Sequence, residues 1–508
     1  MGLLSSRFTF LIKIGVTALL AALFGWLFAD EPGGMRIGLF ALAWLLGLIL
    51  ARRDVRQPRL GTAVALALAA IFCGSLIYDP GPLAWLLFGC ALSIAALLPR
   101  MVVFDDAWRW AVRLLLYGLT GVVKPVVDFA HLLALRPRGN RGRIRSVAAI
   151  LALPLVGGAI FTALFASANP LIANMFANLQ PPRVAQTMRW GFATFLVWPA
   201  FRPHRLVTRL RIPEPVIGLP GTSLPSVLIS LGLFNLLFAV QNGLDIAFLW
   251  SGASLPAGMS MTEYVHRGAY PLIVTALLAG LFVLTMLRPG TATAANPWAR
   301  RLVAMWVAQN IFLVASSALR TIDYILQFEL TAWRIAALLW MGLVATGLLL
   351  ICWRMWYGRS ARWLINANAL ASAVVLAPCC FIDLSASAAR WNVEHASEVG
   401  GGAAPIDLCY LGDMGASALL PLIELEQRPL PAEFIDRVRY VRANILASVA
   451  RRQSVWADWT PHDAMRIAAA QRLLGLNPPQ PIKPPAGYAR TCTGKIGRPP
   501  ALTEGAPQ

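Results

Sequence analysis

The sequence predicts an all-α protein: a polytopic transmembrane helical bundle of about eleven spans, with a small helical extramembrane subdomain at its C-terminal end. Eleven apolar stretches, each about the length of a bilayer crossing, occupy residues 14 to 379. Lys and Arg are abundant in every second connection and scarce in the others. Only 13% of residues are charged and 58% are apolar, which excludes a soluble chain of 508 residues. Backbone groups cannot stay unpaired in hydrocarbon, so we expect these stretches to cross as helices.

The first apolar stretch follows Arg7 and Lys13, the layout of a signal peptide. No small-residue cleavage site precedes Asp30 and further apolar segments follow, so we interpret it as an uncleaved first helix. The predicted spans are 14–29, 37–51, 61–78, 82–98, 146–168, 184–201, 225–246, 268–287, 302–319, 332–353 and 363–379.

The basic residues predict the orientation. With a cytoplasmic N-terminus, the inside segments hold 25 of the 31 Lys and Arg of residues 1–379. Residues 184–201 are the weakest span, because Gln186 and Arg189 lie in their first turns, but omitting this span would move three arginine clusters outside. Eleven crossings then place the C-terminal subdomain in the periplasm of a bacterium, and the protein in its inner (plasma) membrane.

The net charge of +20 could indicate nucleic acid, but its distribution argues against this partner. Residues 1–379 carry 31 basic and 12 acidic residues, whereas residues 380–508 carry 13 and 12. The excess belongs to the membrane half, so we expect the lipid bilayer and its anionic lipids as partners, and no nucleic acid.

Residues 1–98 are predicted to form an N-terminal four-helix membrane segment, followed by a segment, 99–145, that is too polar to cross. Its polar residues recur at spacings of three and four, which predicts an amphipathic helix on the cytoplasmic leaflet, bent near Pro125. A basic loop follows, and its arginines should attract lipid headgroups by about 1 kcal/mol each. Plain topological anchoring is the simpler interpretation. These arginines are Arg136, Arg138, Arg141, Arg143 and Arg145.

Residues 146–379 are predicted to form the main membrane domain, with about seven spans. Mixed apolar and charged positions then indicate four short helices in an extramembrane subdomain, 380–476. Residues 477–508 hold eight prolines and are expected to be disordered.

Four cysteines, Cys379, Cys380, Cys409 and Cys492, lie in or beside the predicted periplasmic part, where oxidation is permitted. A disulfide from Cys380, or its neighbour Cys379, to Cys409 would tie the last membrane helix to the subdomain. Free thiols are the alternative.

Polar residues toward the outer ends of the later spans are the candidate site, because such residues usually face a bundle interior or a water-filled cavity. Each also has a structural interpretation as a helix cap, a helix-surface pair or an interhelical hydrogen bond. Neither a metal-ligand spacing nor a catalytic motif is found, and no cofactor is expected. The candidate polar pocket comprises Asp245, Glu263, His266, Arg267, Gln309, Asn310, Arg320, Asp323, Tyr324 and Arg334.

The sequence around these residues resembles the bacterial inner-membrane family catalogued as a domain of unknown function, the 4153/4173 group. The resemblance covers about residues 150–475, and the Glu-Tyr-x-x-Arg-Gly stretch at 263–268 is its most specific part. It implies a multi-span membrane protein with a helical C-terminal extension and no particular activity. The matching runs are 233–242, 255–268, 320–324, 330–335, 390–396 and 458–459.

Three classes of function remain open. We favour a non-enzymatic envelope sensor or scaffold that contacts a periplasmic protein partner through the subdomain, since the chain lacks catalytic signatures. The second class is a transporter with a polar pocket between the seventh and tenth spans. The third is a membrane-embedded lipid- or glycan-modifying enzyme that uses Glu263, His266 or Asp323 as acid or base.

Overall fold

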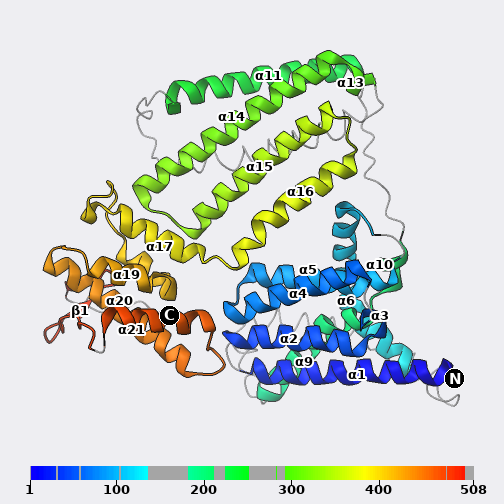
Figure 1. The fold of residues 1–508 in the computed structure, drawn as a ribbon, viewed down its shortest axis with the longest axis horizontal. Helices are drawn as coiled ribbons and strands as arrows, with labels where there is room; N and C mark the ends of the chain where they lie inside the picture. Colours follow the sequence, from blue (N-terminus) through cyan, green and yellow to red (C-terminus); the bar gives the residue numbers. More distant parts are fainter. Residues whose placement is uncertain are drawn as a thin grey trace, which may run out of the picture. The chain divides into compact units, whose positions relative to one another are not determined.

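The computed structural model describes residues 2–29, 33–56, 59–101, 104–134, 181–210, 223–250, 278, 282, 292–475 and 477–497. These residues are almost entirely helical, which confirms the all-α fold class (Figure 1). They divide into two compact units. The first comprises residues 1–105 and 109–212, and the second comprises residues 106–108 and 213–508.

The first unit is a bundle of long apolar helices with three short helical segments at their ends. Helix α4 packs between α2 and α5, and α1 packs against α9. A Cβ atom at Gly38 would lie 2.5 Å from Ile77 Cγ1, so glycine is what lets α2 approach α4 this closely. The elements are α1 (Gly2–Leu27), α2 (Met35–Ala51), α3 (Arg53–Arg56), α4 (Leu60–Tyr78), α5 (Pro82–Leu97), η1 (Leu98–Arg100), α9 (Pro181–Phe201) and α10 (Arg205–Arg209).

Helix α6 (Ala107–Ala134) runs crosswise at one end of this bundle (Figure 1). Arg113 donates to the carbonyl oxygen of Val207, and the Trp198 indole nitrogen donates to Asp128 Oδ2 at 2.8 Å. Positions 113 and 128 are about 22 Å apart along a helix. Both residues contact the short stretch 198–210, at and just after the C-terminal end of α9. Helix α6 therefore crosses the end of α9 and does not pack along its length.

The length and hydropathy of α6 also qualify it as a candidate span, so the prediction that this segment is too polar to cross is wrong on that criterion. The charged residues of this segment suggested that it is too polar to cross, but Arg113 and Asp128 are buried inside the unit. The crosswise contacts still favour an interfacial helix, which stays a prediction. The arginines at 136–145 lie outside the described residues.

The second unit begins with helices that pack as a layer. Helix α14 contacts both α11 and α15, and α15 contacts α16. The side chains of Asn296, Thr331 and Ser360 accept hydrogen bonds from the first free backbone amides of α14, α15 and α16, which fixes where each helix begins. The elements are α11 (Leu224–Asp245), the π-helical η2 (Ile246–Trp250), α13 (Ala292–Ala295), α14 (Pro297–Phe328), α15 (Ala332–Trp356), α16 (Ala361–Leu376) and η3 (Pro378–Cys380).

The chain then enters a compact helical bundle with its own apolar core, formed mainly by α19, α20 and their neighbours. This part is the C-terminal bundle, residues 383–497. Its elements are α17 (Leu384–His395), η4 (Ser397–Val399), α18 (Leu408–Asp413), η5 (Gly415–Ala418), α19 (Leu419–Glu426), α20 (Ala432–Ser454), α21 (Pro461–Leu474) and the antiparallel strands β1 (Ala489–Arg490) and β2 (Ile496–Gly497).

Two predictions about the chain end are wrong. We expected residues 477–508 to be disordered because of their prolines, but residues 477–497 are folded onto α20, where Asp436 Oδ1 accepts from the Ile482 amide at 2.7 Å. Residues 498–508 lie outside the described residues. Cys409 forms a disulfide with Cys492, and Cys380 is not part of a disulfide. The predicted Cys380–Cys409 bridge failed because it assumed that the tail carrying Cys492 stays away from the bundle.

The domain boundaries also differ from those predicted. Residues 184–201 were assigned to a membrane domain, 146–379, but α9 packs in the first unit with α1. Helix packing, rather than the order of spans along the chain, decides this division.

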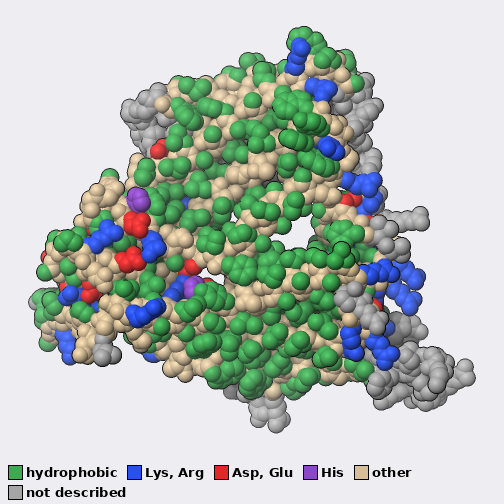
Figure 2. All heavy atoms as spheres, in the orientation of Figure 1, with side chains coloured by type: hydrophobic (Ala, Val, Ile, Leu, Met, Phe, Trp, Pro, Cys, Tyr) green, Lys and Arg blue, Asp and Glu red, His purple; other side chains and the backbone are tan. Residues whose placement is uncertain are grey.

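Eight helices among the described residues are long and apolar enough to cross a membrane, and α2 is a shorter apolar helix. Seven of them coincide with predicted spans, and α6 is the eighth. Helix α9 is not among them. The predicted span 146–168 lies outside the described residues, as does the span 268–287 apart from Leu278 and Phe282. Figure 2 shows apolar side chains covering the long helices, with charged side chains gathered on the C-terminal bundle and at helix ends. The eight helices are Phe10–Leu27, Leu60–Tyr78, Pro82–Arg100, Ala107–Ala130, Leu224–Asp245, Pro297–Phe328, Ala332–Trp356 and Ala361–Cys380.

Candidate functional site

Helices α11 and α14 run parallel and are joined by amide side chains. Asn235 Nδ2 donates to the carbonyl oxygen of Leu302 at 3.0 Å, and Asn242 Nδ2 donates to that of Gln309 at 3.1 Å. Both bonds join residues 67 positions apart, and a constant offset requires the two helices to point the same way. We call this contact the α11–α14 seam.

The seam contains a buried ion pair. Asp245 ends α11 and pairs with Arg320 of α14, and these residues are only 2% and 6% exposed. Gln241 Nε2 also donates to Asp245 Oδ1, at 3.1 Å. An isolated charge is costly in an apolar surrounding, so pairing is what permits either residue to be there.

Five buried side-chain oxygens along the seam accept no hydrogen bond from the described residues: Asn235 Oδ1, Asn242 Oδ1, Asp245 Oδ2, Gln309 Oε1 and Asn310 Oδ1. The amide nitrogens of the three asparagines are all used by backbone carbonyls. Unused oxygens therefore predominate at the seam, although the buried Nε of Arg320 also makes no hydrogen bond with the described residues. A group that brings donors or positive charge, such as a proton or a cation, would satisfy these oxygens.

A second polar group lies at the turn between α14 and α15. Glu329 has a positive φ of 64°, a conformation that residues other than glycine rarely adopt. Arg334 holds this turn: its Nη1 donates to the carbonyl oxygens of Phe328 and Glu329, and its guanidinium lies 4.3 Å from the centre of the Tyr324 ring. The arrangement locks the turn in one geometry.

This turn is also built into the C-terminal bundle. The side chain of Asn392 on α17 binds both backbone groups of Leu330, accepting from its amide at 2.7 Å and donating to its carbonyl at 3.0 Å. Glu329 Oε1 accepts from the Asp407 amide at 2.8 Å. Three hydrogen bonds thus fasten the α14–α15 turn to two segments of the bundle.

Burial shifts the acid–base behaviour of this turn. It raises the pKa of the Glu329 carboxyl, and the nearby charges of Asp407 and Glu398 raise it further, while the Asp407 amide and Arg334 oppose them. Burial likewise raises the pKa of Tyr410, with Arg334 acting against it. Glu329 is therefore the group at the turn most easily protonated as pH falls.

The structure divides the predicted pocket into two groups. Asp245 and Arg320 meet at the seam, where Gln309 and Asn310 also lie, whereas Tyr324 and Arg334 meet at the turn. Asp323 is partly buried on α14 between them. Glu263, His266 and Arg267 lie outside the described residues.

Three residues that connect the turn to the bundle were not predicted from the sequence: Glu329, Asn392 and Asp407. A signal existed for two of them: Glu329 comes directly before the matching run at 330–335, and Asn392 lies inside the run at 390–396. Both runs were noted only as parts of a resemblance, although they meet in space.

A family model described as "Domain of unknown function (DUF4153)" matches residues 60–425, which is more than half of the chain. The chain belongs to the DUF4153 family. No curated protein and no solved structure matches it. The matched part starts earlier and ends sooner than the predicted 150–475. It includes the seam, the α14–α15 turn and Asn392, but not α20, α21 or Cys492.

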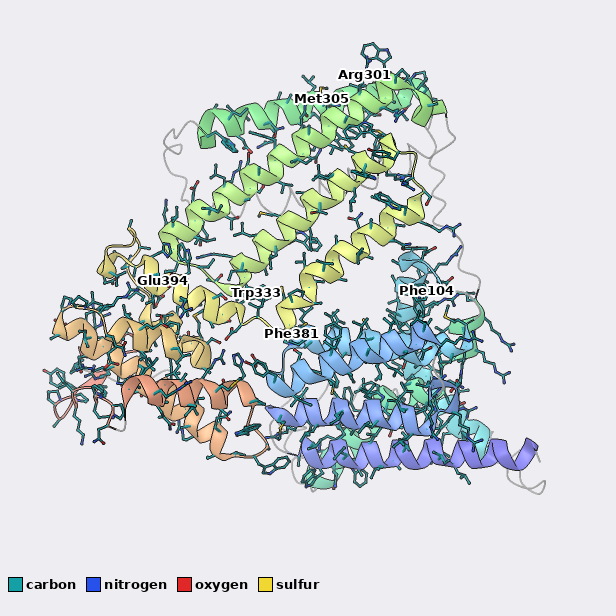
Figure 3. The ribbon with its side chains drawn as sticks, viewed as in Figure 1. Phe104, Arg301, Met305, Trp333, Phe381 and Glu394 are labelled. Atoms are coloured by element: carbon teal, nitrogen blue, oxygen red, sulfur yellow. A yellow bond between two sulfur atoms is a disulfide. The ribbon has the colours of Figure 1, made fainter. Side chains whose placement is uncertain are left out.

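The DUF4153 region of the second unit carries aromatic residues at both ends of its long helices. Trp333, which is 86% exposed, and Phe381 lie at the end next to the bundle (Figure 3). Trp298, at the start of α14, and Trp353, near the end of α15, lie at the other end. Trp333 and Trp353 are about 30 Å apart along α15, the thickness of a hydrocarbon core. The end with Trp353 also carries the arginines Arg300, Arg301, Arg354, Arg359 and Arg362.

The bundle has a groove of about 650 Å³ beside the disulfide, lined partly by residues within the DUF4153 match and partly by residues beyond it. Helices α18 and α20 and both disulfide cysteines line it. Its polar lining comes mainly from Asp413, Tyr440, Asn444, Ser448, Arg451 and Arg452.

Proposed function

We propose that this protein is a multi-pass inner-membrane sensor or scaffold without enzymatic activity. Its N-terminus is cytoplasmic and its C-terminal bundle is periplasmic. Support for this orientation comes from the second unit, where the arginine-rich ends of α14, α15 and α16 are opposite to the ends next to the bundle. Basic residues stay on the cytoplasmic side of bacterial membrane proteins. The two bands of exposed aromatic residues support a spanning arrangement.

The observation that carries the proposal is the fastening of the α14–α15 turn to the bundle through Asn392 and Asp407. Arg320 precedes Glu329 by nine residues on α14, about 13 Å of helix. A partner that moves the bundle would therefore move the helix that carries the buried Asp245–Arg320 pair. A scaffold or sensor needs such a rigid connection between its extramembrane and membrane parts.

In this proposal the groove beside the disulfide contacts a periplasmic protein partner. Support comes from its mixed lining of apolar, amide, hydroxyl and charged side chains, most of them on α20, which lies outside the family match.

The test places a photo-crosslinking amino acid at Asn444, in the groove, in the full-length protein in its native membrane. A matched control places it at Gln471, which is exposed on α21 and outside the groove. We expect one discrete protein adduct from position 444 and none from position 471. Equal labelling at both positions, or none at either, contradicts the proposal.

The five buried oxygens of the seam favour a second candidate function, cation or proton transport. Purified protein in liposomes loaded with a pH-sensitive dye would then carry protons or Na⁺ down an imposed gradient, and Asp245→Asn would abolish the flux. A flux no greater than in empty liposomes rules this candidate out.

A further inference from the structure

The C-terminal ends of α2, α5 and α9 meet at one end of the first unit, around a fully buried arginine. Arg52 Nη1 donates to the carbonyl oxygens of Ala96 at 2.5 Å and Ala200 at 3.0 Å, and so closes the ends of α5 and α9. Arg52 Nε donates to Asp54 Oδ1 at 3.0 Å, and Arg52 Nη2 donates to Asp54 Oδ2 at 2.6 Å. Burial opposes ionisation of Asp54, but Arg52 and Arg100 prevail and lower its pKa. Asp54 is thus neutralised by Arg52.

The remaining arginines at this end are exposed and in excess. Arg53, Arg59, Arg205 and Arg209 form no ion pair with any described residue. Arg100 Nε lies 3.8 Å from Asp54 Oδ2. The positive charges of Arg52, Arg202 and Arg205 repel the charge of Arg100. We call Arg53, Arg59, Arg100, Arg205 and Arg209 the basic end. Five like charges beside the already paired Asp54 favour the binding of an anion.

An exposed apolar surface adjoins the basic end. Arg113 of α6 donates to the carbonyl oxygens of Val207 and Leu210, which fastens α10, with Arg205 and Arg209, onto α6. The opposite face of α6 exposes large apolar side chains along its length. They include Leu115, Leu119, Val122, Val126 and Phe129.

The basic end and the adjoining apolar face of α6 together indicate which kind of anion binds. A soluble phosphate would use only the arginines and would gain nothing from the apolar face of α6. A phospholipid would place its phosphate among the arginines and its acyl chains beside the apolar helix.

We propose that the basic end and α6 together bind a phospholipid with an anionic headgroup, its phosphate lying between Arg100 and Arg205. The site is independent of the proposed sensor or scaffold function. It also differs from the predicted arginine loop at 136–145.

The test measures binding of phosphatidylglycerol to full-length protein in nanodiscs of phosphatidylcholine, by native mass spectrometry at increasing lipid fractions. The variant combines Arg205→Gln and Arg209→Gln, both exposed and unpaired within the described chain. Each arginine near a lipid surface contributes about 1 kcal/mol, so we expect about 30-fold weaker binding. The control combines Arg451→Gln and Arg472→Gln, exposed arginines of the C-terminal bundle, and should bind as the wild type does.

Three results would overturn the proposal: equal binding by variant and wild type, an equal loss in the control, or displacement of the lipid by millimolar glycerol phosphate, which would indicate a soluble phosphate ligand. If the first variant does not fold in phosphatidylcholine alone, the pair Arg53→Gln and Arg59→Gln replaces it with the same expected direction.

Discussion

Two buried arginines, one in each part of the second unit, are held in opposite ways. In the C-terminal bundle, Arg442 Nε binds Glu426 Oε2 at 3.1 Å, its Nη2 binds the carbonyl oxygen of Pro479 at 2.6 Å, and Arg439 satisfies the other oxygen of Glu426. In the seam, Arg320 pairs with Asp245, whose Oδ2 accepts no hydrogen bond from the described residues.

The difference teaches what each region is built to do. A saturated network fixes one geometry, because any movement breaks several bonds at once. A pair surrounded by unused acceptors has room for another proton, ion or arrangement. The bundle is therefore the rigid part and the seam the adjustable part, and the α14–α15 turn joins them.

The largest expected effect is in the bundle. Arg442→Ala should destabilise the full-length protein by about 3–5 kcal/mol, because Glu426 stays buried beside a cavity with one partner fewer. Thermal unfolding in detergent, followed by circular dichroism, measures this. The exposed Arg451→Ala is the control and should unfold like the wild type. A loss below about 1 kcal/mol for Arg442→Ala would mean that the network is not saturated in solution.

The disulfide should have the next largest effect, since it holds the tail that supplies the carbonyl of Pro479. Cys409→Ser should cost about 2–4 kcal/mol, because a bridge between residues 83 positions apart restricts the unfolded chain. The same unfolding measurement applies. Cys380→Ser, which breaks no disulfide, is the matched control, and a similar loss in both variants would contradict the Cys409–Cys492 pairing.

The seam should tolerate more. Asp245→Asn keeps an oxygen for Arg320 but removes the charge opposite it, so it should cost about 3 kcal/mol, the lower end of the range for breaking a buried ion pair. The double variant Asp245→Leu with Arg320→Leu should recover most of this loss, since apolar pairs often replace buried ion pairs without penalty. If the double variant is less stable than Asp245→Asn, the seam is as rigid as the bundle.

The smallest effect concerns Glu329 and depends on pH. Because its pKa is raised in the folded protein, its contribution to stability is complete below the ordinary value of 4.5 and is lost as pH rises through the raised value. Glu329→Gln keeps an oxygen for the Asp407 amide, so it should match the wild type at acid pH and exceed it at neutral pH. Unfolding temperatures across pH 4 to 8 test this, and a parallel shift at all pH values would contradict it.

Apolar length was enough to predict seven of the eight candidate membrane helices that the structure describes, because this signal is local in the sequence. Contacts between distant residues were not predictable in this way. Arg320 has Asp323 three positions away as an obvious partner, yet it pairs with Asp245, 75 positions earlier. Asp245 itself was identified correctly as a candidate, since a charge at the end of an apolar span requires a partner.

The errors have the same origin. Proline content predicted a disordered tail. However, Asp436 accepts a hydrogen bond from the Ile482 amide and Arg442 donates one to the Pro479 carbonyl, and these bonds hold the tail on α20. The polar spacing of α6 was recognised, but its polar face turned out to be buried against α9 and α10. In each case the partner was a residue far away in the chain.

The most direct test of the account is backbone hydrogen exchange at residues 316–331 in nanodisc-embedded, full-length protein, comparing the wild type with Asn392→Ala. Loss of the two hydrogen bonds to Leu330 should weaken the turn by about 1–2 kcal/mol and speed exchange there by about 5- to 30-fold. The bundle variant Gln427→Ala should leave these amides unchanged. If exchange at 316–331 is the same in Asn392→Ala and the wild type, the bundle does not hold α14, and the proposed connection between bundle and seam is wrong.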